Sequence, residues 1–119
     1  MGRDEQIQFA EVWIAGWNAQ DLSTILAHYA DTVVFHSPMI ARVTGEDRSS
    51  VTGLTALGAY WEQALKLAPD LRFELQTVLL GRDSLTILYT NQTGRQAAET
   101  FVFTPAGKVS LSIATYAPS

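Results

Sequence analysis

The chain has 119 residues, of which 47% are apolar and 17% are charged, so it can bury a core and is too apolar to be disordered. Its net charge of −4 and scattered basic residues argue against nucleic-acid binding, and the lack of cysteine excludes thiolate catalysis and cysteine-ligated zinc. No apolar run approaches the roughly 18 residues of a membrane span and the first residues do not resemble a signal peptide, so we expect no membrane partner and a single cytoplasmic domain over residues 1–119.

Apolar periodicity predicts two short helices at the start of the chain. Apolar residues recur every three or four positions over residues 7–17, which is typical of one buried helix face. Residues 18–20 interrupt this pattern, and Asp21 is placed to cap a second helix. The apolar stripe of that second helix is Leu22, Ile25, Leu26 and Tyr29.

A strand, a loop and a third helix are predicted next. The β-branched and aromatic residues 32–37 favour a strand, which Pro38 stops. Residues 39–53 carry Gly, Ser and charged residues and predict a loop, of a length that often covers a functional site. Residues 54–65 place apolar side chains on one helix face before Pro69 ends the segment.

The last third of the chain predicts four strands, over residues 71–79, 84–92, 96–104 and 109–116. Short turns that contain glycine join them, which indicates an antiparallel meander. In the first of these strands, alternation places every second residue from Leu71 to Leu79 on the inward face.

Several local phrases carry a resemblance over nearly the whole chain. They are Trp17-Asn18-Ala19-Gln20-Asp21-Leu22, Tyr29-Ala30-Asp31, Val34-Phe35-His36-Ser37-Pro38, Gly53-Leu54-Thr55-Ala56-Leu57, Tyr60-Trp61 and Gly107-Lys108-Val109. With the order of elements, they resemble the nuclear transport factor 2-like superfamily, particularly its SnoaL-like branch. The resemblance implies an α+β fold in which N-terminal helices pack in a curved, mostly antiparallel sheet, a cystatin-like cone with a central apolar cavity. The loop over residues 39–52 is then expected at the cavity mouth as a mobile cover.

Glu99 is the first candidate for a catalytic group. Strand alternation places it on the same face as Phe101 and Phe103, and two phenylalanines favour an inward face. A carboxyl group there has a raised pKa, which suits proton transfer near neutral pH. The alternative is a strand carboxylate that reaches solvent or pairs with an arginine. By resemblance, Glu99 falls where steroid isomerases place an acid that donates a hydrogen bond to the reacting oxyanion.

The resemblance also departs from the steroid isomerases at two positions. Ser37 occupies the position of their general-base aspartate, and Trp13 that of their oxyanion-hole tyrosine. A lone hydroxyl is no base and an indole N–H is no phenol, so we expect a polar wall at Ser37 and an apolar wall with one donor at Trp13. Alternation points His36 away from Ser37, so His36 is either a structural histidine near a helix or dimer partner, or a catalytic one if the strand end twists.

The expected cavity wall combines rings with small side chains. The resemblance places an apolar ring at Tyr116, and two small residues share its strand face. The predicted lining residues are Trp13, Phe35, Ser37, Tyr60, Trp61, Phe101, Ser112, Ala114 and Tyr116. The two histidines, His28 and His36, lie on different elements without a metal-binding motif, so we expect no metal and no cofactor.

These patterns lead to two functional hypotheses. The first is a SnoaL-like enzyme or binder that acts on an apolar, oxygen-bearing small molecule by cofactor-free acid–base chemistry, of isomerase, cyclase or hydrolase type. The second is a non-catalytic dimeric ligand-binding or accessory domain. The outer strand face carries Thr86, Leu88 and Thr90, which is too apolar to be left wholly in water, so we expect a homodimer through the sheet, as the resemblance also suggests.

Overall fold

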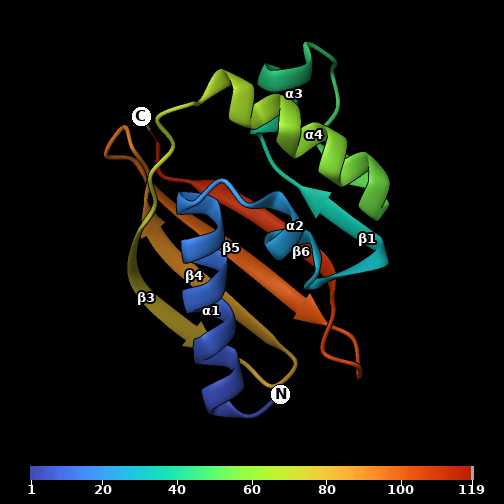
Figure 1. Cartoon of the computed structure of the whole chain (residues 1–119), viewed down its shortest axis with the longest axis vertical. Helices are drawn as coiled ribbons and strands as arrows, with labels where there is room; N and C mark the ends of the chain where they lie inside the picture. The colour runs from blue at the N-terminus through green and yellow to red at the C-terminus, as the bar shows by residue number, and fades with distance from the viewer. Residues whose placement is uncertain (119) are drawn as a thin grey trace.

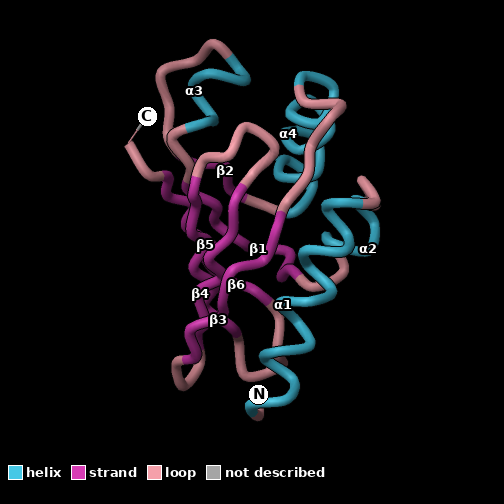
Figure 2. The backbone as a smooth tube through the Cα atoms, turned by 90° about the vertical axis from the view of Figure 1, so that its left-hand side faces the viewer, coloured by secondary structure: helices cyan, strands magenta, loops and turns pink. Residues whose placement is uncertain are grey.

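The computed structural model describes residues 1–118 and shows two layers, a curved sheet with helices along one face (Figures 1 and 2). The elements are α1 (Arg3–Asn18), α2 (Leu22–Leu26), β1 (Tyr29–His36), α3 (Met39–Thr44), β2 (Ser50–Thr52), α4 (Leu54–Leu67), β3 (Glu74–Leu80), β4 (Ser84–Thr90), β5 (Gln96–Phe103) and β6 (Val109–Tyr116). Helix α1 lies along β3, β4 and β5, and α4 crosses β1 at the other end of the molecule (Figure 1).

The strand order in the sheet is β2-β1-β6-β5-β4-β3. Strands β3 to β6 pair antiparallel with their sequence neighbours, so the predicted meander is confirmed. Strand β1 pairs parallel with β6 and antiparallel with β2, which makes the sheet mixed. The predicted α+β fold, with helices packed in a curved and mostly antiparallel sheet, is therefore confirmed.

A glycine allows the tight corner between α1 and α2. Asp21 caps α2 by accepting a hydrogen bond of 3.2 Å from the Thr24 backbone N–H. At Gly16, a Cβ atom would lie 2.9 Å from Cγ1 of Ile25, closer than packed carbon atoms approach one another. Glycine at this position therefore lets the buried face of α2 settle directly on α1.

The predicted second helix is too long, because Tyr29 belongs to β1. Helix α2 ends at Leu26, and the backbone N–H of Val109 donates to the carbonyl oxygen of His28 at 2.9 Å. Tyr29 itself pairs with Val109 at the start of the parallel ladder with β6. The helical spacing of Tyr29 was real, but pairing with a distant strand overrides it.

The prediction of a loop over residues 39–53 is also wrong. The segment forms α3 and β2, and β2 pairs with the end of β1 through Phe35 and Val51. Ile40 of α3 and Val51 of β2 are both buried in the core. Burial of these two side chains against α4 and β1 stabilises an ordered structure in this segment. The polar residues between them conceal this in the sequence.

The predicted inward alternation of β3 fails in its second half. A register shift between Leu75 and Thr77 leaves Leu75 and Val78 half-buried on the core side, and Leu79 is 54% exposed. The strand also begins later than predicted, because Asn18 holds the segment before it. The Asn18 side chain donates to the Phe73 carbonyl oxygen at 2.9 Å and accepts from the Phe73 N–H at 2.7 Å.

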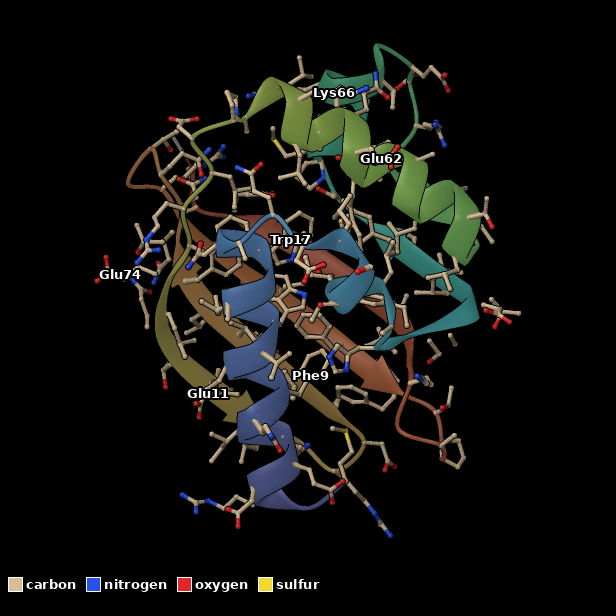
Figure 3. The ribbon with its side chains drawn as sticks, viewed as in Figure 1. Phe9, Glu11, Trp17, Glu62, Lys66 and Glu74 are labelled. Atoms are coloured by element: carbon tan, nitrogen blue, oxygen red, sulfur yellow. The ribbon has the colours of Figure 1, made fainter. Side chains whose placement is uncertain are left out.

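Aromatic rings dominate the core between the layers. Phe9 and Trp17 of α1 point from the helix toward the sheet side, whereas Glu11 points outward (Figure 3). Phe9 meets Phe101 of β5 edge-on, with ring centroids 5.0 Å apart. Within residues 1–118, the structure contains no helix that combines the length and apolar character needed to span a membrane.

Candidate functional site

Glu99 lies in the interior, on the core-facing side of β5. It alternates with Ala97 and Phe101, both buried, and its side chain is 4% exposed. The neighbouring strands place Ile87 of β4 and Ala114 of β6 beside it. The single ion pair among the described residues joins Arg48 to Glu46, so no cationic side chain neutralises Glu99 there.

Two opposing effects set the proton affinity of this carboxyl group. Burial raises the pKa of Glu99 to about 7, and a hydrogen bond from Ser112 opposes that rise. The Ser112 hydroxyl donates to Oε2 of Glu99 at 2.8 Å, which favours the ionised form. Both protonation states are therefore populated near neutral pH, as a group that gives and takes protons requires.

The polar contact continues from Ser112 toward α1. The Tyr29 phenol of β1 lies near Ser112, and the Trp13 indole donates to the Tyr29 oxygen at 3.1 Å. The Trp13 N–H is thus used within the protein. The donor that the sequence predicted on the cavity wall is not free for a ligand.

Tyrosines from separate elements surround Glu99. Burial raises the pKa of each phenol, and the negative charge of Glu99 raises it further. All of them remain protonated at neutral pH, so they act as hydrogen-bond donors. These residues are Tyr29 of β1, Tyr60 of α4, Tyr89 of β4 and Tyr116 of β6.

Tyr116 follows Ala114, the partner of Glu99, by two residues on β6. It is half-buried, and burial and the charge of Glu99 raise its pKa, whereas the nearby Ser37 and Tyr89 lower it. The guanidinium of Arg95 lies 5.2 Å above the Tyr116 ring, and its Nε donates to the Ala117 carbonyl oxygen at 2.6 Å. Ser37 is buried, and its hydroxyl oxygen accepts from the Met39 N–H at 3.1 Å, where α3 begins.

The remaining predicted wall residues are buried and contact one another. The Phe35 ring lies 5.5 Å from Trp61 and 6.0 Å from Tyr60, and Phe101 and Ala114 flank Glu99 on β5 and β6. Two hollows lie on the outside around α4, one against α2 and one against Asp31 and Thr52. Neither hollow borders Glu99. The apolar cavity around Glu99 that the sequence predicts stays a prediction.

His36 and His28 lie away from the Glu99 cluster. His36 pairs with Ser50 and Ile113 and faces away from the buried side chains of Phe35 and Ser37. His28 meets the Phe9 ring edge-on at 5.4 Å, and burial lowers its pKa. The described residues contain no group of three or more histidine, aspartate and glutamate side chains that could together hold a metal ion.

Sequence reasoning did not assign Tyr29 and Tyr89 to the site. Alternation with the buried Leu85 and Ile87 was a usable signal for Tyr89, because it places that ring on the face that Glu99 shares. Tyr29 gave no such signal, since its spacing fitted the stripe of α2 and its partner Val109 lies far along the chain.

Comparisons with known proteins agree with this architecture. The family model described as a SnoaL-like domain matches residues 10–111. A SnoaL-like protein of unknown function from Burkholderia thailandensis E264 is 42% identical in sequence, and its crystal structure superposes with a TM-score of 0.90 over 99% of each chain. A search of curated proteins finds no significant match.

More distant structures share the fold alone. A protein of unknown function with a cystatin-like fold from Methylobium petroleophilum PM1 has a TM-score of 0.78 at 16% identity, with coverage of 100% of this chain and 80% of that one. A protein from Agrobacterium tumefaciens strain C58, provisionally named an isomerase of the SnoaL-like family, has a TM-score of 0.76 at 14% identity. In that comparison the coverage is 97% of this chain and 99% of the other.

Proposed function

The chain belongs to the SnoaL-like family, and from this premise we propose that it is a cofactor-free enzyme that moves a proton on an apolar, oxygen-bearing small molecule, with Glu99 as the acid–base group. One observation carries the proposal. A buried carboxyl group without a cationic partner among the described residues lies near tyrosine phenols, and burial raises its pKa to about 7. A buried acid of this kind is costly to the fold, and perturbed groups of this kind concentrate at functional sites.

In this proposal Glu99 transfers the proton and the tyrosine phenols bind the oxygen of the ligand. Ionised Glu99 takes a proton from a carbon next to a carbonyl group, and the protonated form returns it to another atom of the same molecule. The phenols of Tyr60, Tyr89 and Tyr116 donate hydrogen bonds to the oxygen that becomes negative in between. Isomerisation and aldol-type cyclisation of carbonyl compounds both include such a step.

The ligand class follows from the surroundings of Glu99. The side chains around it are mainly aromatic and apolar, and Ser112 is the buried hydroxyl that contacts it. Such walls favour a molecule with extended apolar surface and few oxygens. Tyr60 is buried and Tyr116 is half-buried, so a ligand that reaches Glu99 has to displace rings such as these.

The proposal can be tested before the natural substrate is identified. A panel of aromatic and alicyclic ketones is incubated with the protein in deuterated water, and incorporation of deuterium next to the carbonyl group is followed by NMR. We expect catalysed exchange for at least one ketone, and a loss of about 100-fold or more in Glu99→Gln, the typical scale of one acid–base group. Glu62→Gln, a change on the exposed face of α4, is the matched control. Equal rates in Glu99→Gln and the unaltered protein would overturn the proposal.

A second function, a non-catalytic dimeric binding domain, is supported by the packing of the rings expected to line a cavity. The Phe35 ring lies 6.0 Å from Tyr60 and 5.5 Å from Trp61. This function predicts ketone binding that Glu99→Gln leaves intact, without deuterium exchange by either protein.

A further inference from the structure

We infer that Tyr29 and Ser112 are positioning residues for Glu99, which hold Oε2 as a hydrogen-bond acceptor and thereby make Oε1 the oxygen that carries and delivers the proton. The inference rests on the proposed function of Glu99 and specifies how the site works. It starts from the two ends of the polar contact, at 3.1 Å from the Trp13 indole to Tyr29 and at 2.8 Å from Ser112 to Glu99.

The direction of each hydrogen bond follows from the groups involved. An indole N–H only donates, so the Tyr29 oxygen accepts from Trp13 and its own hydrogen is left for another partner. Ser112 is the hydroxyl group near it, and we infer that the two share a hydrogen bond. The Ser112 hydrogen is already given to Glu99, so Tyr29 donates to Ser112. The chain of donors therefore runs from Trp13 through Tyr29 and Ser112 to Oε2.

This direction decides which carboxylate oxygen is reactive. While Ser112 donates to Oε2, a proton bound to Glu99 resides on Oε1. Oε1 has no hydrogen-bond partner among the described residues, and it is not among their fully enclosed polar atoms. The proton is thus held on the oxygen that remains open to a ligand, and the donors on the α1 side are all in use.

The ligand consequently meets a different set of donors. Tyr60 of α4, Tyr89 of β4 and Tyr116 of β6 are the other titratable groups near enough for the charge of Glu99 to raise their pKa. Behind them, Arg95 lies over the Tyr116 ring, and the charge of Arg48 acts on Tyr60. A ligand oxygen therefore binds on the Tyr116 side of the carboxyl group, while Tyr29 stays part of the protein's own network.

The test measures the pKa of Glu99 by carboxyl-carbon NMR in hydroxyl-deletion variants. Ser112→Ala removes the donor to the ionised form, so we expect the pKa of Glu99 to rise by about one to two units. Tyr29→Phe keeps the ring and removes the hydroxyl that orients Ser112, so we expect a smaller rise in the same direction. The indole N–H resonance of Trp13 should also move in Tyr29→Phe, because it loses its acceptor.

Ser110→Ala is the control on the same strand, since the Ser110 hydroxyl donates to the Val102 carbonyl oxygen and does not contact Glu99. We expect this change to leave the pKa of Glu99 where it is. An unchanged pKa in Ser112→Ala or in Tyr29→Phe would overturn the inference. A failure of the proposed function looks different, because the shifts would then appear in the variants while the unaltered protein catalyses no exchange on ketones.

Discussion

Glu99 makes the stability of the fold depend on pH. Its pKa is about 7 in the folded protein against an ordinary value of 4.5, so the folded state holds a proton that the unfolded state releases between these values. The stabilisation is therefore complete below about pH 4.5 and is lost as the pH rises through about 7. A shift of this size corresponds to on the order of 3 kcal/mol in the free energy of unfolding. Urea unfolding between pH 5 and pH 8 measures it.

Glu99→Gln isolates this contribution, because glutamine keeps an oxygen for Ser112 and does not titrate. We expect the variant to gain stability relative to the unaltered protein as the pH rises from 5 to 8. His28 acts with the opposite sign, since burial lowers its pKa and its ionisation costs stability at low pH. The contribution of His28 is the same in Glu99→Gln and in the unaltered protein, so it cancels in the difference between their free energies of unfolding. If these free energies changed in parallel with pH, the raised pKa of Glu99 would be contradicted.

For single residues, the sequence predicts which strand face a side chain lies on, because that depends only on local alternation. Glu99, Phe101 and Phe103 lie on one strand face, and the structure places all three inward. The network behind Glu99 was not predictable in the same way. Trp13 and Tyr29 meet only because α1 and β1 pack together, and Ser112 meets Glu99 across the pairing of two strands. Contacts between distant segments follow from the fold and not from spacing along the chain.

The Asn18 side chain joins α1 to the segment before β3, and we predict that this contact stabilises the fold. Its amide satisfies both backbone groups of Phe73, at 2.9 Å and 2.7 Å. Asn18→Ala leaves this partly buried peptide without partners, so we expect the free energy of unfolding to fall by about 2 kcal/mol. Gln8→Ala, at an exposed position on the same helix, should change it by less than about 0.5 kcal/mol. Urea unfolding compares the two, and equal small effects would show that Phe73 is held by other contacts.

The segment between β1 and α4 should show graded backbone protection. The Ser37 N–H donates to the Ser49 carbonyl oxygen and the Gly53 N–H to that of Val33, so both ends of this segment are held against β1. Residues 45–48 are exposed, and we expect their amides to exchange within the shortest labelling times. Hydrogen exchange with mass spectrometry should find slow exchange at the two held amides. Uniformly fast exchange over residues 39–52 would instead support the mobile cover that the sequence predicted.

The elements themselves were predictable to different degrees. The limits of β6 match the prediction, because Gly107 and the following alternation mark them clearly. Helix α3 and strand β2 were missed because only Ile40 and Val51 enter the core, and the polar residues between them dominate the pattern. The register shift in β3 is invisible in the sequence, since it depends on how β3 pairs with β4.

The outer face of the sheet is the surface that the fold leaves uncovered. Helices α1, α2 and α4 lie on the opposite side of the sheet (Figure 2). Ile113 of β6 is 38% exposed on this outer face, and its neighbours across the strands are His36 and Thr100. Leu88, Val102 and Leu111 are only half-buried. An apolar surface of this kind commonly marks a contact between protein chains.

We predict that two copies of the chain pair through this outer face. Ile113→Lys puts a charge at its centre, where the side chain is exposed enough that the single chain tolerates the change. We expect the unaltered protein to sediment as a dimer at micromolar concentration and Ile113→Lys to sediment as a monomer, because an unpaired charge buried between two chains is costly. Gln8→Lys adds the same charge at an exposed position on α1, on the side of the sheet opposite to the outer face, and this variant should remain dimeric. A monomeric unaltered protein, or an Ile113→Lys variant that still dimerises, would show that the outer face does not join two chains.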